Sequence, residues 1–301
     1  MGLNESPKAW KDEEYASKVT TLKEACQPLF RGAKCTKLAL VLTMMNLFTI
    51  HGATHKMQDD LFSLFSKFVL LDDNRMPKNH SEAKKLTRTL GLQYECIHAC
   101  KAGHVLYRGE YKDLVKCPVA NCGLPRYKQV GRSLVPNKVV RHFPVIPQLR
   151  RMYRSPAIAE LLMWHKNNRS MDGKIRHPAD SLAWAHIDDH IDPSFRMDGR
   201  NMWLAVAGDG FAPFSDKISQ WSTWPFYVVI YNLPPWLATK KFFVLLALLV
   251  PGKESVKMDN FDVFLQPLIE ELQQLWSPGV VAFDVRKDPQ NRAFTLQAIV
   301  I

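Results

Sequence analysis

The sequence has no apolar run long enough to cross a lipid bilayer. Its longest such run, Phe242–Val250, has nine residues, whereas a membrane-spanning helix needs about 20. A secretory signal is also missing, because the N-terminus is polar and charged as far as Tyr15. These absences predict a protein with no membrane partner. Gly2 and Ser6 fit the N-myristoylation pattern of a surface-attached protein, but so short a pattern often matches by chance.

Cysteine is scarce and clustered. The 301 residues contain six cysteines, four of them between residues 96 and 122, which favours metal binding in a reducing compartment over a disulfide framework. Cys100 and His104 form one pair of metal-ligand side chains, and Cys117 and Cys122 form a second. Zinc takes four such ligands in a tetrahedron, and two pairs on two turns supply them without a preformed core. The pattern predicts a structural zinc site.

This zinc assignment leaves alternatives open. Cys96 and His98 are competing ligands just upstream, and unliganded buried cysteines beside a surface histidine are the simpler interpretation. Catalytic zinc is not expected, because no glutamate that would activate water stands at a fixed spacing from these ligands.

Acidic side chains are almost missing from one stretch. The net charge is +11, and between Arg126 and Arg176 twelve basic residues are opposed by Glu160 and Asp172 alone. Nearly the whole positive surplus therefore lies in this stretch, which favours contact with nucleic acid over general solubility. The candidate nucleic-acid residues are Arg126, Lys128, Arg132, Arg141, Arg150, Arg151 and Arg154.

Hydrophobic periodicity and proline positions predict an α+β protein made of five segments. The N-terminal half is predicted to contain a polar tail (1–34), a helical region (35–91) with helices at Thr36–Gly52, Asp59–Leu71 and Ser81–Gly91, and a zinc-binding module (92–128). Next come a basic linker (129–198) that is extended before a helix near Ala157–Lys166 and irregular from His177 to Pro193, and a sheet-containing segment (199–301).

The last segment has the order strand, strand, strand, helix, strand, which is the start of an α/β domain. Strands are expected at Trp203–Ala207, Phe226–Tyr231 and Phe242–Val250, bounded by Pro225, Pro234-Pro235 and Pro251-Gly252; an amphipathic helix at Asp259–Trp276; and a final strand at Phe294–Ile301.

Asp209 stands at the end of the first of these strands, between Gly208 and Gly210. A carboxylate at a strand end, with glycines that permit close approach, suits a magnesium ligand that must reach a phosphate, although an ordinary Asp-Gly turn is the alternative. Two metals about 3.5–4 Å apart need several carboxylates. No compelling second ligand follows among Asp259, Asp262, Glu270, Glu271, Asp284 and Asp288: the first two suit helix capping, and the two glutamates are expected on the solvent side.

A series of short blocks resembles the transposase of plant CACTA (En/Spm-like) DNA transposons, in consistent order over roughly residues 25–301. Around Asp209 they are Asp209-Gly210-Phe211-Ala212-Pro213-Phe214, Trp224-Pro225, Tyr231-Asn232-Leu233-Pro234-Pro235-Trp236, Pro251-Gly252 and Phe264-Leu265-Gln266-Pro267-Leu268-Ile269-Glu270-Glu271-Leu272. Upstream they are Ala83-Lys84-Lys85-Leu86, Ile97-His98-Ala99-Cys100, Val105-Leu106-Tyr107-Arg108, Glu110-Tyr111, Arg126-Tyr127-Lys128 and Arg176-His177-Pro178-Ala179-Asp180-Ser181.

The resemblance implies a nuclear DNA transposase with a ribonuclease H-like catalytic domain of the DDE type. Such an enzyme cuts and joins DNA at transposon ends with two Mg²⁺ ions, and a second transposon-encoded protein is a further implied partner. Asp209 corresponds to its first carboxylate, while Cys100, Cys117 and Cys122 correspond to its cysteine knuckles. His104 replaces a cysteine of the family, and four residues rather than two separate Cys117 from Cys122.

The resemblance also implies carboxylates that this sequence does not contain. In the family a second Asp follows the strand matching Phe294–Ile301, and a Glu comes later. The expected architecture is therefore a helical N-terminal region, a zinc-knuckle module and a truncated ribonuclease H-like domain, catalytically incomplete. The alternative is a non-catalytic, zinc-dependent remnant that binds DNA or protein.

Overall fold

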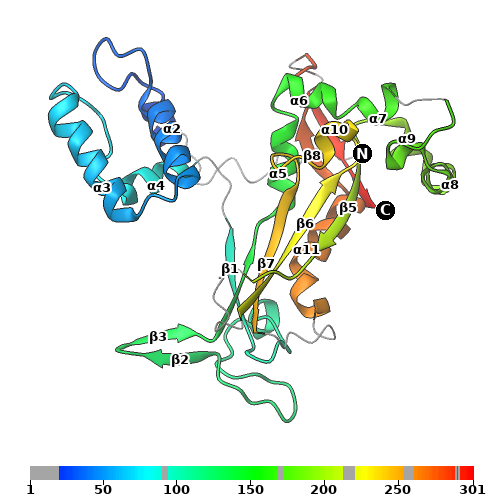
Figure 1. Cartoon of the computed structure of the whole chain (residues 1–301). Helices are drawn as coiled ribbons and strands as arrows, with labels where there is room; N and C mark the ends of the chain where they lie inside the picture. The colour runs from blue at the N-terminus through cyan, green and yellow to red at the C-terminus, as the bar shows by residue number, and fades with distance from the viewer. Residues whose placement is uncertain are drawn as a thin grey trace. The chain divides into compact units, whose positions relative to one another are not determined.

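The chain forms two compact units, Met1–Leu92 and Gln93–Ile301. Figure 1 shows the computed structural model, which describes residues 20–89, 94–168, 172–212, 221–253, 261–288, 290 and 292–301. The Gly2 and Ser6 pattern and most of the predicted polar tail lie outside the described residues. Within the described ranges, no helix combines the length and apolarity needed to cross a membrane.

The first unit is helical, as predicted. Helix α2 (Lys37–Ile50) begins after Thr36, whose hydroxyl accepts a hydrogen bond from the Ala39 N–H at 3.1 Å. The helix ends before Gly52, which has a φ of 63° that suits glycine. Both predicted ends of this helix are confirmed.

The next two helices of this unit complete its core. Helix α3 (His55–Leu64) begins four residues before the predicted Asp59, because Thr54 caps it, and continues as a π-helix, η2 (Phe65–Val69). Helix α4 (His80–Thr89) follows. The Phe48 and Phe62 rings meet edge to face in the core, with centroids 5.7 Å apart.

The second unit is built on one six-stranded sheet that draws strands from the whole of residues 94–301 (Figure 1). Neighbouring strands are antiparallel except for β5 and β10, which are parallel. The strands in spatial order are β1 (Glu95–Ala99), β4 (Lys138–His142), β7 (Leu245–Lys253), β6 (Trp221–Ile230), β5 (Met202–Gly208) and β10 (Ala298–Val300).

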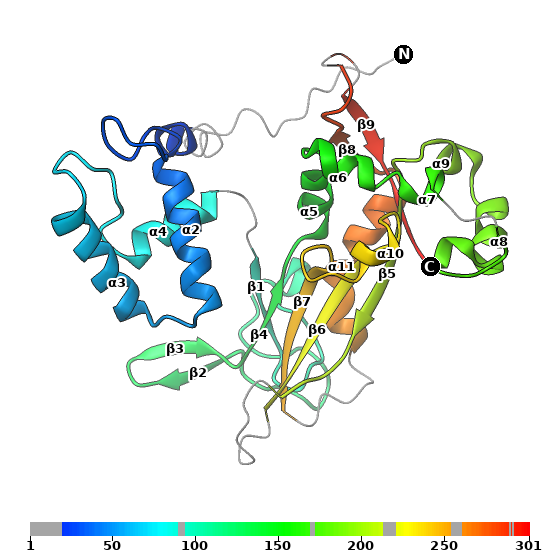
Figure 2. The same ribbon diagram turned by 45° about the horizontal axis from the view of Figure 1, so that its top comes forward.

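Helix α11 (Phe261–Trp276) covers one face of this sheet (Figure 2). Its Phe261 ring lies 4.8 Å from the Trp224 ring and 5.7 Å from the Phe226 ring, both on β6. Behind them the apolar core includes Leu204, Val228, Leu248, Phe264 and Leu268. The other face of the sheet carries Cys96, Arg141 and Ala207, which are exposed.

Two predicted strand boundaries are wrong, because Pro225 and Pro251-Gly252 lie inside β6 and β7. Proline has no N–H to donate, so it interrupts a ladder. The ladder between β5 and β6 ends at the pair Gly208 and Phe226, and pairing resumes only at an isolated bridge between Phe211 and Thr223. Pro225 thus lies in the gap of that ladder, where a missing N–H costs least.

The prediction that the stretch from His177 to Pro193 is irregular is wrong as well. It contains the 3₁₀ turn η4 (Pro178–Asp180) and the helix α8 (Leu182–His190), followed by α9 (Pro193–Met197). Ser181 caps α8 through the Trp184 N–H. The Trp184 ring stacks on the Trp203 ring of β5, with ring centroids 4.1 Å apart. Tertiary packing therefore supports a helix whose own sequence is weakly amphipathic.

The basic segment is extended as predicted as far as β4, but its residues Val145–Met152 are helical where an extended chain was predicted. Helix α5 (Val145–Met152) tolerates Pro147 because this residue lies in the first turn, where N–H groups have no partner in the helix. The helix near Ala157–Lys166 is divided into α6 (Pro156–Leu161) and α7 (Trp164–Asn167). A short helix α10 (Pro235–Ala238) lies between β6 and β7.

The final predicted strand is two strands in two sheets. Strand β9 (Ala293–Leu296) pairs with β8 (Val280–Phe283), which was not predicted, whereas β10 joins the main sheet. Gln297 separates them, and its N–H donates to the Asn201 side chain at 2.9 Å. The mixed α+β class is confirmed.

Candidate metal centre, catalytic carboxylate and basic segment

The first pair of predicted ligands lies on a tight turn directly after β1. The Cys100 N–H donates to the Val105 carbonyl, and the Gly103 N–H donates back to the Cys100 carbonyl, both at 2.9 Å. Gly103 has a φ of 85°, which a residue with a Cβ rarely adopts. This turn brings His104 back beside Cys100.

The second pair lies on a similar turn. The Cys117 N–H donates to the Leu124 carbonyl at 2.9 Å, and the Cys122 N–H donates to the Val119 carbonyl at 3.1 Å. Asn121 and Gly123 adopt positive φ angles of 63° and 55° on either side of Cys122. The four residues between the cysteines, two more than in the family that the sequence resembles, are therefore accommodated in a closed turn.

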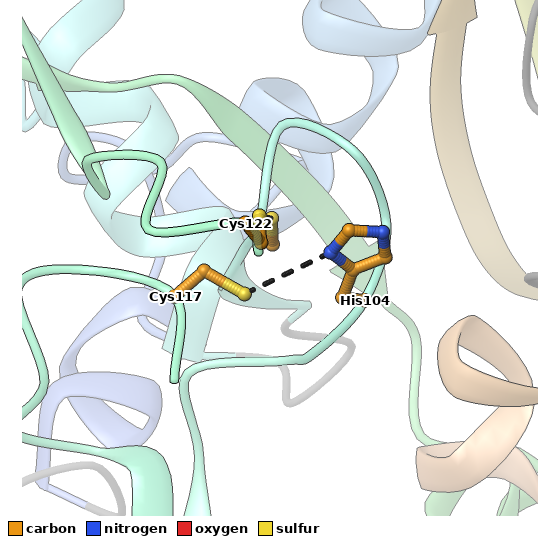
Figure 3. A group of neighbouring side chains, drawn as sticks. His104, Cys117 and Cys122 are labelled. Carbon is orange, nitrogen blue, oxygen red and sulfur yellow. Dashed lines mark hydrogen bonds between the residues drawn. The ribbon is translucent and has the colours of Figure 1, made fainter. Parts of the chain in front are cut away.

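The two turns bring all four predicted ligands together. Their ligand atoms lie within 4.8 Å of one another; the Cys100 and Cys122 sulfurs are 3.7 Å apart, and the Cys117 sulfur is 3.9 Å from His104 Nδ1. Figure 3 shows His104 and Cys117 directed toward each other. Ligands of a tetrahedral zinc ion are about 3.3–3.8 Å apart, so the spacing and the donor set fit zinc.

The competing ligands are placed elsewhere. Cys96 is exposed on β1, and His98 Nδ1 accepts a hydrogen bond from Arg126 Nε at 3.0 Å. Burial, followed by the Arg126 charge, lowers the pKa of His98. Neither residue belongs to the four-ligand group.

The thiols of the group differ in environment. Burial raises the pKa of Cys117 to about 12, whereas a backbone hydrogen bond at Leu124 lowers the pKa of Cys122 to about 7. The metal-free cluster therefore retains protons that a metal ion would displace, so metal binding releases protons.

Lys138 is a neighbour of the cluster that the sequence interpretation missed. It pairs with Ala99 across β1 and β4, and its ammonium lies 4.9 Å from the centre of the Phe264 ring. Burial lowers the pKa of Lys138, while the nearby Cys100 opposes that shift. Zinc with three thiolates and a neutral histidine carries a net charge of −1, which a neighbouring ammonium offsets. The available signal was a lysine at an inward position of β4, two residues before the buried Val140.

Asp209 follows β5 and is exposed, and its carboxylate accepts a hydrogen bond from the Gly210 N–H at 2.8 Å. A Cβ at Gly208 would lie 2.6 Å from the Phe226 ring, and one at Gly210 would lie 2.7 Å from the Trp224 ring. The flanking glycines therefore admit two aromatic rings of β6, in addition to any role in approach to a phosphate. Asp209 belongs to no group of three or more metal-ligand side chains within the described ranges.

The later carboxylates make structural contacts of their own and are not grouped with Asp209. Glu271 was expected on the solvent side, and this is wrong: its side chain is 13% exposed and accepts hydrogen bonds from the Val145 and Ile146 N–H groups at 2.9 and 3.1 Å. Glu270 is exposed and pairs with Arg108.

Of the other candidates, Asp284 is fully buried and paired with Arg286. Burial tends to raise the pKa of Asp284, but hydrogen bonds from Arg286 outweigh this and lower it. Asp262 and Asp288 are exposed, and Asp259 lies outside the described residues.

Six of the seven predicted nucleic-acid residues occupy three places. Lys128 and Arg132 are exposed on the hairpin of β2 (Tyr127–Val130) and β3 (Ser133–Pro136), and Arg141 is exposed on β4. Arg151 and Arg154 are exposed at the end of α5, where the neighbouring Arg150 is half-buried. Burial lowers the pKa of Arg150.

Arg126 has a different environment from the other six. Its guanidinium donates to the Lys112 and Leu114 carbonyls at 2.6 and 3.2 Å, and it stacks over the rings of Tyr107 and Tyr127. These contacts hold the Arg126 side chain within the metal-binding module.

Comparison with known proteins gives one match to a protein family. No curated protein matches the chain. The matched segment runs from the turn before η4 through β5, β6, β7 and α11 to β10, and therefore includes Asp209 and the parallel pair of strands. Residues 172–301 match the family model described as Transposase family tnp2, which makes this part of the chain similar to a transposase.

Proposed function

We propose that the chain is a DNA-binding protein of the transposase type, from a CACTA (En/Spm-like) transposon of a plant, acting in the nucleus. The observation that carries the proposal is the match of residues 172–301 to a transposase family. The ordered sequence blocks support the CACTA assignment, and the acid-poor basic segment supports DNA at the transposon ends as the partner. A second transposon-encoded protein remains a proposed partner.

The proposed ribonuclease H-like core rests on the order of the elements in the main sheet. Strands β5, β6 and β7 are consecutive and antiparallel, α11 follows them, and β10 returns parallel to β5 on its free side. Parallel neighbours have their carboxyl ends at the same edge of the sheet, which is where acidic side chains of separate strands converge. Asp209, one residue beyond β5, would supply the first Mg²⁺ ligand at that edge.

The zinc cluster is proposed to be structural. Its four protein ligands would fill the tetrahedral coordination of zinc and leave no position for substrate. Zinc would then hold two turns that have little core of their own: Cys100, Val105, Tyr107 and Cys117 are the buried residues there.

DNA binding is the direct test of the proposed partner. The purified chain is expected to bind a fluorescein-labelled duplex DNA, and its affinity should fall steeply between about 50 and 200 mM salt, because each neutralised phosphate contributes about 0.9 to the log–log slope. Fluorescence anisotropy across this range measures the slope. An affinity that does not change with salt would count against nucleic acid as the partner.

Strand cleavage by the chain as it stands is expected to be absent in Mg²⁺. One carboxylate does not hold two metals, and no further described carboxylate joins Asp209 in a ligand group. Incubation of supercoiled plasmid with the purified chain and Mg²⁺ or Mn²⁺ measures nicking. Nicking that disappears in Asp209→Ala would refute this expectation, whereas DNA binding without nicking supports the non-catalytic alternative.

A further inference from the structure

The β2–β3 hairpin is an exposed two-stranded ribbon. Its strands pair from Tyr127 and Pro136 at the base to Val130 and Ser133 at the tip, where Gly131 turns the chain with a φ of 56°. Both views show it extending away from the main sheet (Figures 1 and 2). A two-stranded hairpin is marginally stable by itself in water, so one that projects in this way needs a firm base.

That base is fixed to the metal-binding module. Arg126, directly before β2, makes the contacts with Lys112, Leu114 and His98 described above. Asn137, directly after β3, donates through its N–H to the Arg126 carbonyl at 2.9 Å and through its side chain to the Pro125 carbonyl at 2.8 Å. Both ends of the hairpin are thereby held where the second cysteine turn ends.

The tip carries positive charge and exposed apolar side chains. Lys128 and Arg132 are exposed, and so are Val130 and Leu134, at 53% and 68%. No acidic residue occurs between Asp113 and Glu160, whereas nine basic residues do. This composition suits a polyanion that also offers apolar contacts, as the grooves of DNA do.

The base of the hairpin contacts the same face of the main sheet on which Asp209 lies. The pairs on either side of Asp209 place it opposite Pro225, and the strand pairings continue that row through Leu249 and Arg141 to Cys96 on β1. Alternation along β1 puts His98, which Arg126 contacts, on the same face as Cys96. Strand spacing separates β1 from β5 by about 19 Å, less than the roughly 34 Å of one DNA turn.

We propose that the β2–β3 hairpin enters the major groove of duplex DNA and holds that duplex along the sheet face that carries Arg141 and Asp209. The major groove of B-DNA, about 12 Å wide, admits a two-stranded ribbon, whereas the minor groove, about 6 Å wide, admits one only after the DNA is bent and the groove widened. Lys128 and Arg132 contact phosphates at the groove edges, and Arg141 contacts the backbone between the hairpin and Asp209. This inference rests on the proposed function, since it presupposes that DNA is the partner.

The test removes the two charges of the hairpin and leaves the rest of the chain intact. The double variant Lys128→Gln/Arg132→Gln is expected to bind labelled duplex about tenfold more weakly or worse at about 150 mM salt, with a log–log slope lower by about 1.8. The matched control, Lys240→Gln/Lys241→Gln, removes two exposed lysines after α10 and should change affinity less than about threefold. Zinc content measured on each variant reports that the module is folded.

Groove choice is tested in the same assay. Methyl green, a major-groove ligand, should displace the chain, whereas netropsin, a minor-groove ligand, should not. A duplex RNA should compete poorly, because its major groove is too deep and narrow for side chains to enter. Displacement by netropsin alone, or preference for duplex RNA, would overturn the groove assignment.

The outcomes separate the two proposals. If the wild-type chain binds DNA and the hairpin variant binds equally well, or no worse than the lysine control, the hairpin inference fails and the proposed function stands. If the wild-type chain binds no DNA at all, both fail.

Discussion

Replacement of Cys100 by serine is expected to abolish stoichiometric zinc binding and to unfold the two cysteine turns. Cys100 is fully buried, and its sulfur lies 3.7 Å from that of Cys122. Structural zinc supplies about 10–16 kcal/mol of apparent folding free energy in zinc-finger peptides. The buried apolar residues of this module are few, so the loss of one ligand should exceed what they contribute.

Zinc content and limited proteolysis measure this result together. The wild-type chain should contain one zinc ion, and the Cys100→Ser variant close to none. Trypsin should then cleave the variant rapidly after Lys101, Lys112 and Lys116, which lie within or beside the turns.

The same experiment has two matched controls. Cys96→Ser changes an exposed cysteine four residues away, and Cys35→Ser changes an exposed cysteine of the first unit. Both should retain zinc and resist trypsin as the wild type does. A Cys100→Ser variant that keeps one tightly bound zinc, or a wild-type chain that takes up none, would contradict the assignment.

The ligand set was readable from the sequence because its signal is local. Two pairs of ligand side chains on short turns need only a glycine or asparagine at positive φ beside them, and Gly103, Asn121 and Gly123 are visible in the sequence. The choice between Cys100 and Cys96 was open, however. Cys96 is excluded by its exposed position on β1, and His98 by its hydrogen bond with Arg126, a contact between residues 28 positions apart that no sequence pattern reveals.

Helices and strands were predictable from the sequence where hydrophobic periodicity is strong, and less so where packing between elements determines the structure. Thr36 and Gly52 marked α2 correctly, whereas Pro225 and Pro251 misled: Pro225 lies in a gap of the β5–β6 ladder, and Pro251 pairs with Thr223 inside β7. Helix α8 was missed since its support is the stacking of Trp184 on Trp203, two residues in separate elements. Arg141 and Asp209 share a row only through the register of four strands, which no sequence pattern encodes.

Glu271 is the residue whose role the sequence concealed most, and its loss should have the second large effect. Its carboxylate accepts a hydrogen bond from the Val145 N–H at the start of α5 and lies 2.9 Å from His142 Nε2, so one α11 side chain joins a helix end to β4. His142 is itself buried. Glu271→Ala leaves these partners unmatched inside the protein, where each hydrogen bond to a charged group is worth about 1.5–3 kcal/mol.

We therefore expect Glu271→Ala to lower the stability of the second unit by about 3 kcal/mol or more, and its Tm by at least about 6 °C. The adjacent Glu270→Ala is the control: Glu270 makes an exposed pair with Arg108, worth less than about 1 kcal/mol. Differential scanning calorimetry of both variants in the full chain, at saturating zinc, measures the difference. Glu270 and Glu271 lie next to each other on one helix, so they share helix propensity and charge and differ only in what they contact. Equal Tm values for the two variants would therefore mean that Glu271 does not join α5 to β4.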